Sequence, residues 1–470
     1  MAGDCVLKAS NLEVHRGNMK VFDNLSLSLM KGEVVALVGE NGSGKSTLIE
    51  SLCGITTLKQ GTIHWATESD VFKLIRDSEG RRNPPPPMGL TLQDSGMCGE
   101  ETVSERLLTA LSVSGLDANE EVITELLANW NLNHRANSRI SQLSGGLKRR
   151  LSVLCGLAPV ALSDVERIAI LDEPSEGLDS KSKNLLINWL ITLVSQNNTI
   201  LVSTHDQDII NCASRVLEIN NGTLLEEKGK NIGDYCEIPE SISNKNQEST
   251  TELIKWAFRM EFRNPIDTVG KATPAIVALL LAYALVGKLE LNTDNSDLLA
   301  ALILAPSFIT CISSPAIVSR LNEDGSGKWW NTMVGPVSRV VNSICGASLL
   351  LPIPLAYLSW FILVDTSSSD ISTEVVVWLW LPALVMLDVA IAATGLHLLV
   401  SDLRRANATT SSLLLVTLAW PFLELTDALS TIMTNGMILE LELHNPVVTC
   451  LIASITSAMI WAAAIFIPEY

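Results

Sequence analysis

The sequence is poor in charged residues, and especially in basic ones. Only 18% of its 470 residues are charged and its mean hydropathy is +0.29, whereas soluble domains usually carry about 25% charged residues. This composition excludes a disordered chain and argues against a wholly soluble protein. The 33 Lys and Arg residues against 51 Asp and Glu residues give a net charge of −18. Such a balance argues against a nucleic-acid-binding protein, which normally carries a basic face.

Two further patterns are missing. The nine cysteines are scattered without any CxxC pair, so the sequence predicts neither a disulfide framework nor a zinc site, and it fits a reducing compartment. The segment from Met1 to Ser10 lacks the basic region and apolar core of a secretory signal. We therefore expect no cleaved signal.

The two halves of the chain differ in pattern. Residues 1–245 hold 23 basic and 32 acidic residues, and residues 246–470 hold 10 and 19. The first half alternates short apolar runs with helical stretches, as in an α/β domain. The second half contains apolar runs of membrane length. We predict an α/β domain at 1–228, a polar linker at 229–250 and a transmembrane domain at 251–470.

A phosphate-binding loop follows the first apolar strand, Val34 to Val38. It matches the pattern GxxxxGK[ST] and opens a helix that continues with Thr47; its residues are Gly39, Glu40, Asn41, Gly42, Ser43, Gly44, Lys45 and Ser46. Its backbone N–H groups and the helix N-terminus favour phosphate. Lys45 is expected to reach the terminal phosphates and Ser46 to bind Mg²⁺.

Polar residues also follow two later strands. Ile168 to Leu171 ends in Asp172 and Glu173: Asp172 would hold Mg²⁺, and Glu173 would act as the general base on the attacking water. On its own this pair would also fit an ordinary acidic surface turn. The strand Thr199 to Val202 precedes His205, whose ordinary role after a strand is structural.

Residues 5–228 resemble an ABC-type ATPase, because these motifs recur in the family's order together with Gln93 and the stretch LSGGLKRRLS, Leu143 to Ser152. The resemblance implies an α/β P-loop fold with a helical subdomain, and ATP and Mg²⁺ as cofactors. It also implies roles for the following residues: Gln93 on Mg²⁺, Ser144, Gly145 and Gly146 clamping the γ-phosphate across a dimer, Asp179 in the D-loop, and His205 contacting the γ-phosphate beside Glu173. Where the family has an adenine-stacking aromatic residue this chain has Arg16, which could stack through its guanidinium plane; Phe22 is the alternative.

The second half predicts an all-α domain of six membrane helices in the lipid bilayer. Its apolar segments are 272–287, 298–319, 340–364, 375–400, 411–433 and 446–467, the fifth interrupted by Pro421, Glu424 and Asp427. Nine of the ten basic residues after position 246 fall on one side of these segments, and only Lys288 falls on the other. An ATP-using domain must lie in the cytoplasm, and with that orientation the nine basic residues are on the inner side, in agreement with the positive-inside rule. We expect a multi-pass protein of the inner cell membrane. Buried helices of a soluble domain are the alternative.

Two segments around the first helices carry further resemblances. Residues 251–265 are amphipathic and resemble the interfacial "elbow" helix of ABC-2-type exporters, with a plain linker helix as the alternative. Residues 320–339 are expected to dock onto the ATPase; the run Glu323 to Ser326, followed by Gly335 and Pro336, resembles the CcmB permease of cytochrome c maturation, whose partner ATPase is CcmA.

These resemblances imply a homodimer, because each ATP site is shared between two copies. They imply haem export or haem handling for cytochrome c biogenesis, with haem-handling partner proteins. A general ABC-2-type exporter of drugs, lipids or polysaccharide is one alternative, and a mechanochemical ATPase that releases a haem-carrying partner is another. Four polar residues lie within the apolar segments: Asp388, which could pair with a Ser or Thr, His397, a haem-ligand candidate, and Glu424 and Asp427, which could line a vestibule or belong to half-helices.

Overall fold

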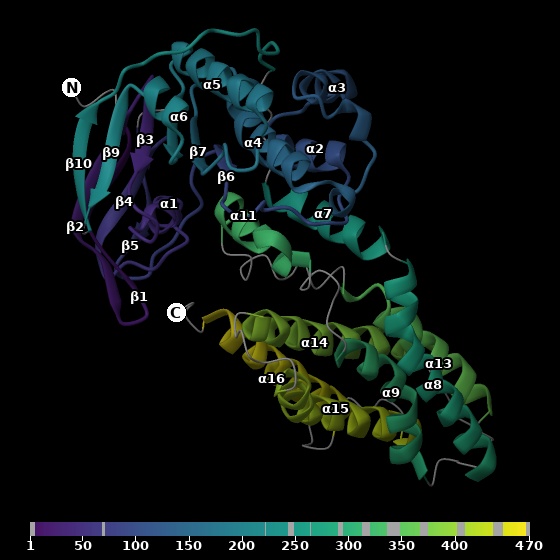
Figure 1. Ribbon diagram of the computed structural model, residues 1–470. Coiled ribbons are helices and arrows are strands. Elements are labelled where there is room, and N and C mark those ends of the chain that lie inside the picture. The colour runs from purple at the N-terminus through teal and green to yellow at the C-terminus, as the bar shows by residue number, and fades with distance from the viewer. Residues whose placement is uncertain are drawn as a thin grey trace. The chain divides into compact units, whose positions relative to one another are not determined.

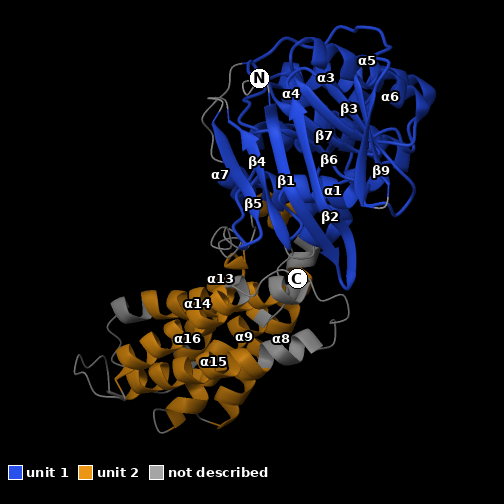
Figure 2. Cartoon of the chain, turned by 90° about the vertical axis from the view of Figure 1, so that its left-hand side faces the viewer, with its two compact units in different colours: residues 1–256, 320–337, 469–470 blue, residues 257–319, 338–468 orange. Residues whose placement is uncertain are grey.

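The computed structural model describes residues 5–67, 71–220, 222–242, 249–263, 265–289, 295–312, 320–335, 348–366, 375–401, 409–435 and 445–466 (Figure 1). Pro336, Arg339, Arg404 and Arg405, to which the sequence assigns cytoplasmic positions, lie outside these residues. The chain divides into two compact units, coloured in Figure 2. The first contains residues 1–256, 320–337 and 469–470, and the second contains 257–319 and 338–468.

A six-stranded sheet forms the centre of the first unit, in the order β10-β9-β3-β8-β7-β6. All neighbours are parallel except the edge pair of β9 and β10. Strands β7 and β8 are buried along their whole length, which explains the apolar runs Ile168–Leu171 and Ile200–Val202 within them. The bounds are β3 Val34–Val38, β6 Gly89–Thr91, β7 Ile168–Asp172, β8 Thr199–Ser203, β9 Arg215–Asn220 and β10 Thr223–Lys228.

A second, antiparallel sheet has the order β2-β1-β4-β5. Buried and exposed residues alternate along β2, as expected for a sheet with one face toward the core. The bounds are β1 Cys5–Arg16, β2 Met19–Met30, β4 Gln60–Ala66 and β5 Phe72–Asp77.

Six helices belong to the ATPase fold of this unit. They are α1 Lys45–Leu52, α2 Val103–Val113, α3 Glu120–Asn129, α4 Gly145–Ala161, α5 Ser180–Ser195 and α6 Gln207–Cys212. A capping box of Thr102 and Glu105 starts α2. Helix α4 packs so close to β6 that a Cβ on Gly156 would lie 2.1 Å from Thr91 Oγ1. Any larger residue would push the helix away from the sheet.

The chain then stays on this unit after β10. The Cys236 amide donates to Thr192 Oγ1 at 3.0 Å, and the Ile242 amide donates to the Leu162 carbonyl at 2.8 Å. The first part of the segment predicted as a linker therefore lies along α5 and the end of α4. Helix α7 Ser249–Arg263 follows, and residues 320–335 return to the same unit as a short 3₁₀ turn, Glu323–Gly325, and α11 Ser326–Met333.

The second unit is a bundle of helices with an apolar core. Its helices are α8 Pro265–Leu289, α9 Ser296–Ile312, α13 Pro352–Thr366, α14 Val375–Ser401, α15 Thr409–Asn435 and α16 Pro446–Phe466. Among the described residues, three stretches are long and apolar enough to cross a membrane: Ala272–Leu289, Trp380–His397 and Pro446–Ala463. Pro421 lies inside α15, so the fifth apolar segment is a single helix and not two half-helices.

Candidate functional site

The loop between β3 and α1 wraps around the amino group of Lys45. Lys45 Nζ donates to the carbonyl of Gly39 at 2.9 Å and to that of Glu40 at 3.3 Å. Gly44 precedes the helix with φ of 107°, and a Cβ there would lie 2.8 Å from Phe22 Cζ. Only glycine fits this combination of backbone angle and close packing. The sequence therefore folds this loop so that a fixed cation lies at its centre.

Glu173 follows β7 in a left-handed conformation, with φ of 47°. Its backbone N–H donates to Ser203 Oγ at 3.0 Å, which helps to hold this conformation. Non-glycine residues with positive φ are uncommon and cluster at functional sites. The turn directs the Glu173 carboxylate toward His205, whose Nε2 lies 3.4 Å from Glu173 Oε1.

The two predicted catalytic residues are connected to the phosphate loop. His205 Nε2 lies 2.9 Å from Lys45 Nζ, so Lys45, His205 and Glu173 form a continuous polar chain. Burial raises the pKa of the Glu173 carboxyl, and the charges of His205 and Lys45 act in the opposite direction. A carboxylate with a raised pKa near a phosphate-binding loop is suited to accept a proton from water.

The predicted magnesium ligands offer only oxygen atoms. They are the hydroxyl of Ser46, the side-chain amide of Gln93 and the carboxylate of Asp172. Asp172 is 3% exposed, and Ser203 Oγ donates to its Oδ1, which fixes its orientation. Hard oxygen donors of this kind fit Mg²⁺, which usually completes its shell with water and substrate phosphates.

A cavity of about 910 Å³ lies over these residues and is the candidate site. It collects side chains from the phosphate loop, from Gln93 and from the ends of β7 and β8. Its lining residues are Arg16, Met19, Val21, Asn41, Gly42, Gly44, Lys45, Ser46, Thr47, Gln93, Glu173, Ser175, Glu176, His205 and Asp206. Four of the predicted residues are not among the lining: Gly39 and Glu40, whose carbonyls accept from Lys45 Nζ, and Ser43 and Asp172.

The residues predicted to clamp the γ-phosphate across a dimer, Ser144, Gly145 and Gly146, do not line this cavity. Ser144 caps α4, its Oγ accepting from the Leu147 amide at 3.4 Å. A Cβ on Gly145 would meet nothing within 4 Å, and Gly146 faces the Gly177 carbonyl. Asp179 caps α5 and pairs with Arg150 at 3.2 Å. Gly145 therefore has open space beside it, whereas Ser144 and Asp179 are engaged as helix caps.

The structure adds Arg149, which the sequence gave no reason to select from the basic run 148–150. Its guanidinium donates to the carbonyls of Leu92 at 2.9 Å, Gln93 at 3.3 Å and Glu173 at 2.6 Å, and also to that of Asp172. Burial lowers the pKa of this guanidinium. Arg149 therefore fastens the Gln93 loop to the end of β7. Helical spacing alone does not say which of three consecutive basic residues points inward.

Residues 320–335 dock onto the ATPase fold, as the sequence predicts. Glu323 Oε2 accepts from the Gly99 amide at 2.9 Å, and the Asp324 carbonyl accepts from the Gly96 amide at 2.8 Å. The Arg106 guanidinium lies 3.8 Å from the centroid of the Trp329 ring, a cation–π contact in a buried setting. The contacted residues Gly96 and Gly99 follow shortly after Gln93 in the sequence. The segment 320–335 therefore contacts the same loop that carries Gln93 to the candidate site.

Arg16, which the resemblance suggests as the base-stacking residue, lines the cavity. Phe22, the alternative base-stacking residue, is completely buried against Gly44 and cannot reach a base. Arg16 lines the cavity, and its NH2 pairs with Glu50 Oε2 at 2.5 Å. Of the two stacking candidates, only Arg16 remains.

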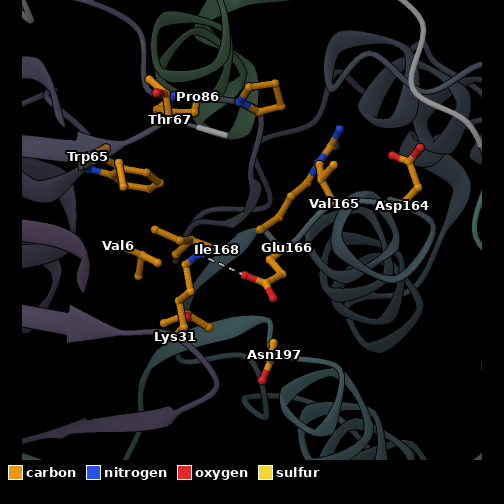
Figure 3. Close-up of a pocket in the computed structure, with 14 residues that line it drawn as sticks. Val6, Lys31, Trp65, Thr67, Pro86, Asp164, Val165, Glu166, Ile168 and Asn197 are labelled. Carbon is orange, nitrogen blue, oxygen red and sulfur yellow. Dashed lines mark ion pairs between the residues drawn. The ribbon is translucent and has the colours of Figure 1, made fainter. Parts of the chain in front are cut away.

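A second cavity, of about 320 Å³, is separate from this site (Figure 3). Val6, Trp65 and Ile168 line it, and the ion pair of Lys31 with Glu166, 3.3 Å long, lies within it. None of the predicted site residues lines this cavity. It therefore contributes nothing to the assignment of the site.

Comparisons with known proteins agree with the motif order. The family model for ABC transporters matches residues 22–176. The macrolide export protein MacB of Hyphomonas neptunium is 31% identical over 276 residues, which are 56% of this chain and 41% of that protein. The Nod factor export protein I of Rhizobium leguminosarum bv. viciae is 30% identical over 298 residues, covering 60% of this chain and 89% of that protein.

This chain spans less than half the length of the MacB proteins that it matches, 41% for Hyphomonas neptunium and 37% for Campylobacter jejuni. A solved dimeric structure of MJ0796, a bacterial ABC transporter cassette, is 23% identical; the match covers 47% of this chain and 98% of that one, with a TM-score of 0.40.

The relatives reported above are MacB and Nod factor export proteins, not CcmA. The α/β P-loop fold predicted for the first half is confirmed, and the resemblance to an ABC-type ATPase is confirmed with it. The chain belongs to the ABC transporter family and carries that family's ATP-binding and ATP-hydrolysing domain.

Proposed function

We propose that this chain is an ATP-driven exporter that works as a homodimer in the cell membrane, with its ATPase domain in the cytoplasm. The observation that carries the proposal is the polar chain of Lys45, His205 and Glu173 along one cavity of an ABC-type domain. The same chain continues into a bundle of apolar helices. An ATPase and a membrane bundle in one polypeptide suit coupled transport.

The nucleotide would lie with its phosphates on the loop from Gly39 to Ser46. Lys45 would neutralise the terminal phosphates, and the α1 N-terminus would add positive potential. Mg²⁺, held through Ser46, Gln93 and Asp172, would supply charge neutralisation between the phosphates. The chain's own residues set where that ion would lie, because Arg149 fixes the carbonyls beside both Gln93 and Asp172.

Hydrolysis would use Glu173 and His205. Glu173 would take a proton from the attacking water, because its backbone turn directs the carboxylate toward the cavity. His205, half-exposed and 2.9 Å from Lys45 Nζ, would contact the γ-phosphate. Both roles are predictions from the motif and the geometry.

Dimerisation would complete each site. Ser144, Gly145 and Gly146 do not line the cavity of their own chain, and Gly145 has open space beside it. A second copy could present this surface to the γ-phosphate, with Asp179 beside it. ATP would then stabilise the closed dimer, because only the closed state offers contacts from both copies.

The second unit would span the membrane with six helices. Three stretches already have the length and composition to do so. Large apolar side chains cover the outside of the bundle, as a lipid-facing surface requires; they include Leu280, Leu281, Phe361, Val416, Leu423, Ile455 and Met459. Asp388, in contrast, is buried and pairs with Ser454 at 2.6 Å.

The substrate is the finer part of the proposal. The relatives are named as exporters of macrolides and Nod factor, which favours export by a general ABC-2-type permease. Haem export for cytochrome c biogenesis rests on the CcmB-like run around Glu323. That run contacts Gly99 and Gly96 of the ATPase. These contacts assign its residues a role in docking and give no information about the substrate.

Reconstitution of the full chain in liposomes tests the proposal. ATP-dependent uptake into inside-out vesicles would be measured for a macrolide, a lipo-oligosaccharide and haem, with Glu173→Gln as the non-hydrolysing control. We expect uptake of one ligand that is lost in the control. ATP hydrolysis without uptake of any ligand, stimulated only by a haem-carrying partner protein, would instead support the mechanochemical alternative.

A further inference from the structure

One carboxylate on α1 binds two cations from distant parts of the chain. Glu50 Oε2 lies 2.5 Å from Arg16 NH2, and Glu50 Oε1 lies 3.1 Å from Lys328 Nζ. The Glu50 side chain is 15% exposed, whereas those of Arg16 and Lys328 are 55% and 51% exposed. The carboxylate is therefore the fixed member of this triad, and the two cations are the members that can move.

The two cations belong to different functional surfaces. Arg16 ends β1 and lines the cavity of the candidate site, on the side that would face a nucleobase. Lys328 lies in α11, within the segment 320–335 that docks onto the ATPase fold. Glu50 stands five residues after Lys45 on the helix that starts at the phosphate loop. All three residues belong to the first unit.

We propose that Glu50 is a positioning residue that links the seating of residues 320–335 to recognition of the nucleoside by Arg16. The inference rests on the proposed function, because it requires a nucleotide in the cavity. While Lys328 binds Glu50 Oε1, Arg16 can donate only to Glu50 Oε2, and its guanidinium plane stays available to stack on the base. When Lys328 leaves, both oxygens accept from the Arg16 fork, which draws the guanidinium toward α1 and away from the base.

Such a link is reciprocal by thermodynamic necessity. If docking of Lys328 favours the base-stacking position of Arg16, a bound nucleoside favours docking of Lys328 by the same factor. The triad thus offers a route between nucleotide and membrane-domain segment that does not pass through Gln93. It acts through the nucleoside part of the ligand, whereas the phosphate loop acts through the phosphates.

A comparison of ADP with pyrophosphate separates the contribution of the nucleoside from that of the phosphates. MgADP and magnesium pyrophosphate would be titrated calorimetrically into the full-length protein in detergent, because only ADP carries a base and neither is hydrolysed by the ATPase reaction. Lys328→Met should weaken ADP binding about two- to fivefold, the range of half-exposed ion pairs, and leave pyrophosphate binding unchanged. Lys328→Arg should restore the wild-type value. In a Glu50→Gln background, Lys328→Met should have no further effect.

Asp324→Asn is the matched control. Asp324 anchors the same segment through Lys148, at 3.9 Å, and has no contact with Glu50. Asn tolerates its positive φ of 41°. This variant should leave the ratio of ADP to pyrophosphate affinity unchanged.

The link would be overturned by equal losses for ADP and pyrophosphate, by an effect of Lys328→Met that survives Glu50→Gln, or by the same ratio change in Asp324→Asn. Wild-type protein that binds no ADP would overturn the proposed function together with the link. Wild-type protein that binds ADP, with Lys328→Met unchanged, would overturn the link alone.

Discussion

The ionisable side chains of the two units are arranged in opposite ways. In the first unit they converge from separate elements on one cavity, with Lys45, His205 and Glu173 in sequence along it. In the second unit two carboxylates each accept from a hydroxyl, Asp388 from Ser454 at 2.6 Å and Asp297 from Ser430. A buried polar group needs a hydrogen-bond partner in either setting. Ionisable side chains that converge on one cavity therefore indicate a chemical site. An isolated pair of a carboxylate and a hydroxyl only satisfies the need for a hydrogen-bond partner.

Replacement of Glu173 should give the largest effect, a loss of ATP hydrolysis. Normal hydrolysis would contradict the view that the converging side chains of the first unit carry out chemistry. Glu173→Gln keeps the shape of the side chain but removes the group that accepts the proton. We expect a fall in kcat of at least about 100-fold, the usual lower range for a lost general base. ATP affinity should be retained, since Lys45 and the loop amides are unchanged. Steady-state hydrolysis and nucleotide titration measure the two quantities; normal turnover would exclude Glu173 as the base.

Arg149 should give the next largest effect. Arg149→Met leaves the buried carbonyls around the site without their charged donor, at a cost on the order of 3 kcal/mol in the free energy of unfolding. Hydrolysis should fall as well, because Gln93 and Glu173 lose a common anchor. The neighbouring Arg150→Met is the control: Arg150 reaches Asp179, which is 57% exposed, so a loss below about 1 kcal/mol is expected. Denaturant unfolding compares them, and equal losses would remove the special role of Arg149.

The pH dependence of hydrolysis should give a smaller but directional effect. Because burial raises the pKa of Glu173, the folded protein binds a proton there at a higher pH than the unfolded chain does. As the pH is lowered, hydrolysis should therefore be lost at a pH higher than the pKa of an exposed glutamate, which is about 4.3. The stability contributed by this group should rise as pH falls through the same range and be lost in Glu173→Gln. The profile of kcat and the melting temperature against pH check both; an acid limb at the exposed value would contradict the assignment.

Much of the first unit could be predicted from the sequence because its motifs are tied to strand ends. Val34–Val38 and Ile168–Leu171 are short, fully apolar runs, and parallel strands bring their carboxyl ends to one edge of a sheet. Lys45 and Glu173 therefore had to meet once both runs were strands. Spacing in the sequence was enough to specify a position in space.

The rest depended on side-chain direction and distant contacts, which no local pattern encodes. Arg149 and Arg150 are adjacent and chemically equal, yet one is buried over four carbonyls and the other reaches Asp179. Likewise, the run at Glu323 suggested a permease family, but in the structure it serves to dock on Gly99. A short motif shared by families can reflect a common interface without reflecting a common substrate.

Asp388 should give the smallest effect, and it tests the second half of the comparison. Asp388→Asn keeps a hydrogen-bonding group beside Ser454, so the unfolding free energy should change by less than about 1 kcal/mol, as is usual for polar pairs between membrane helices. Ser454→Ala, which removes the partner, is the matched variant and should cost about as much. Thermal unfolding in detergent and ATP hydrolysis in liposomes measure the result. If Asp388→Asn abolished transport while stability and basal hydrolysis stayed normal, the carboxylate would act on the substrate. A single buried pair in the second unit would then be a chemical site, and convergence would no longer distinguish the two units.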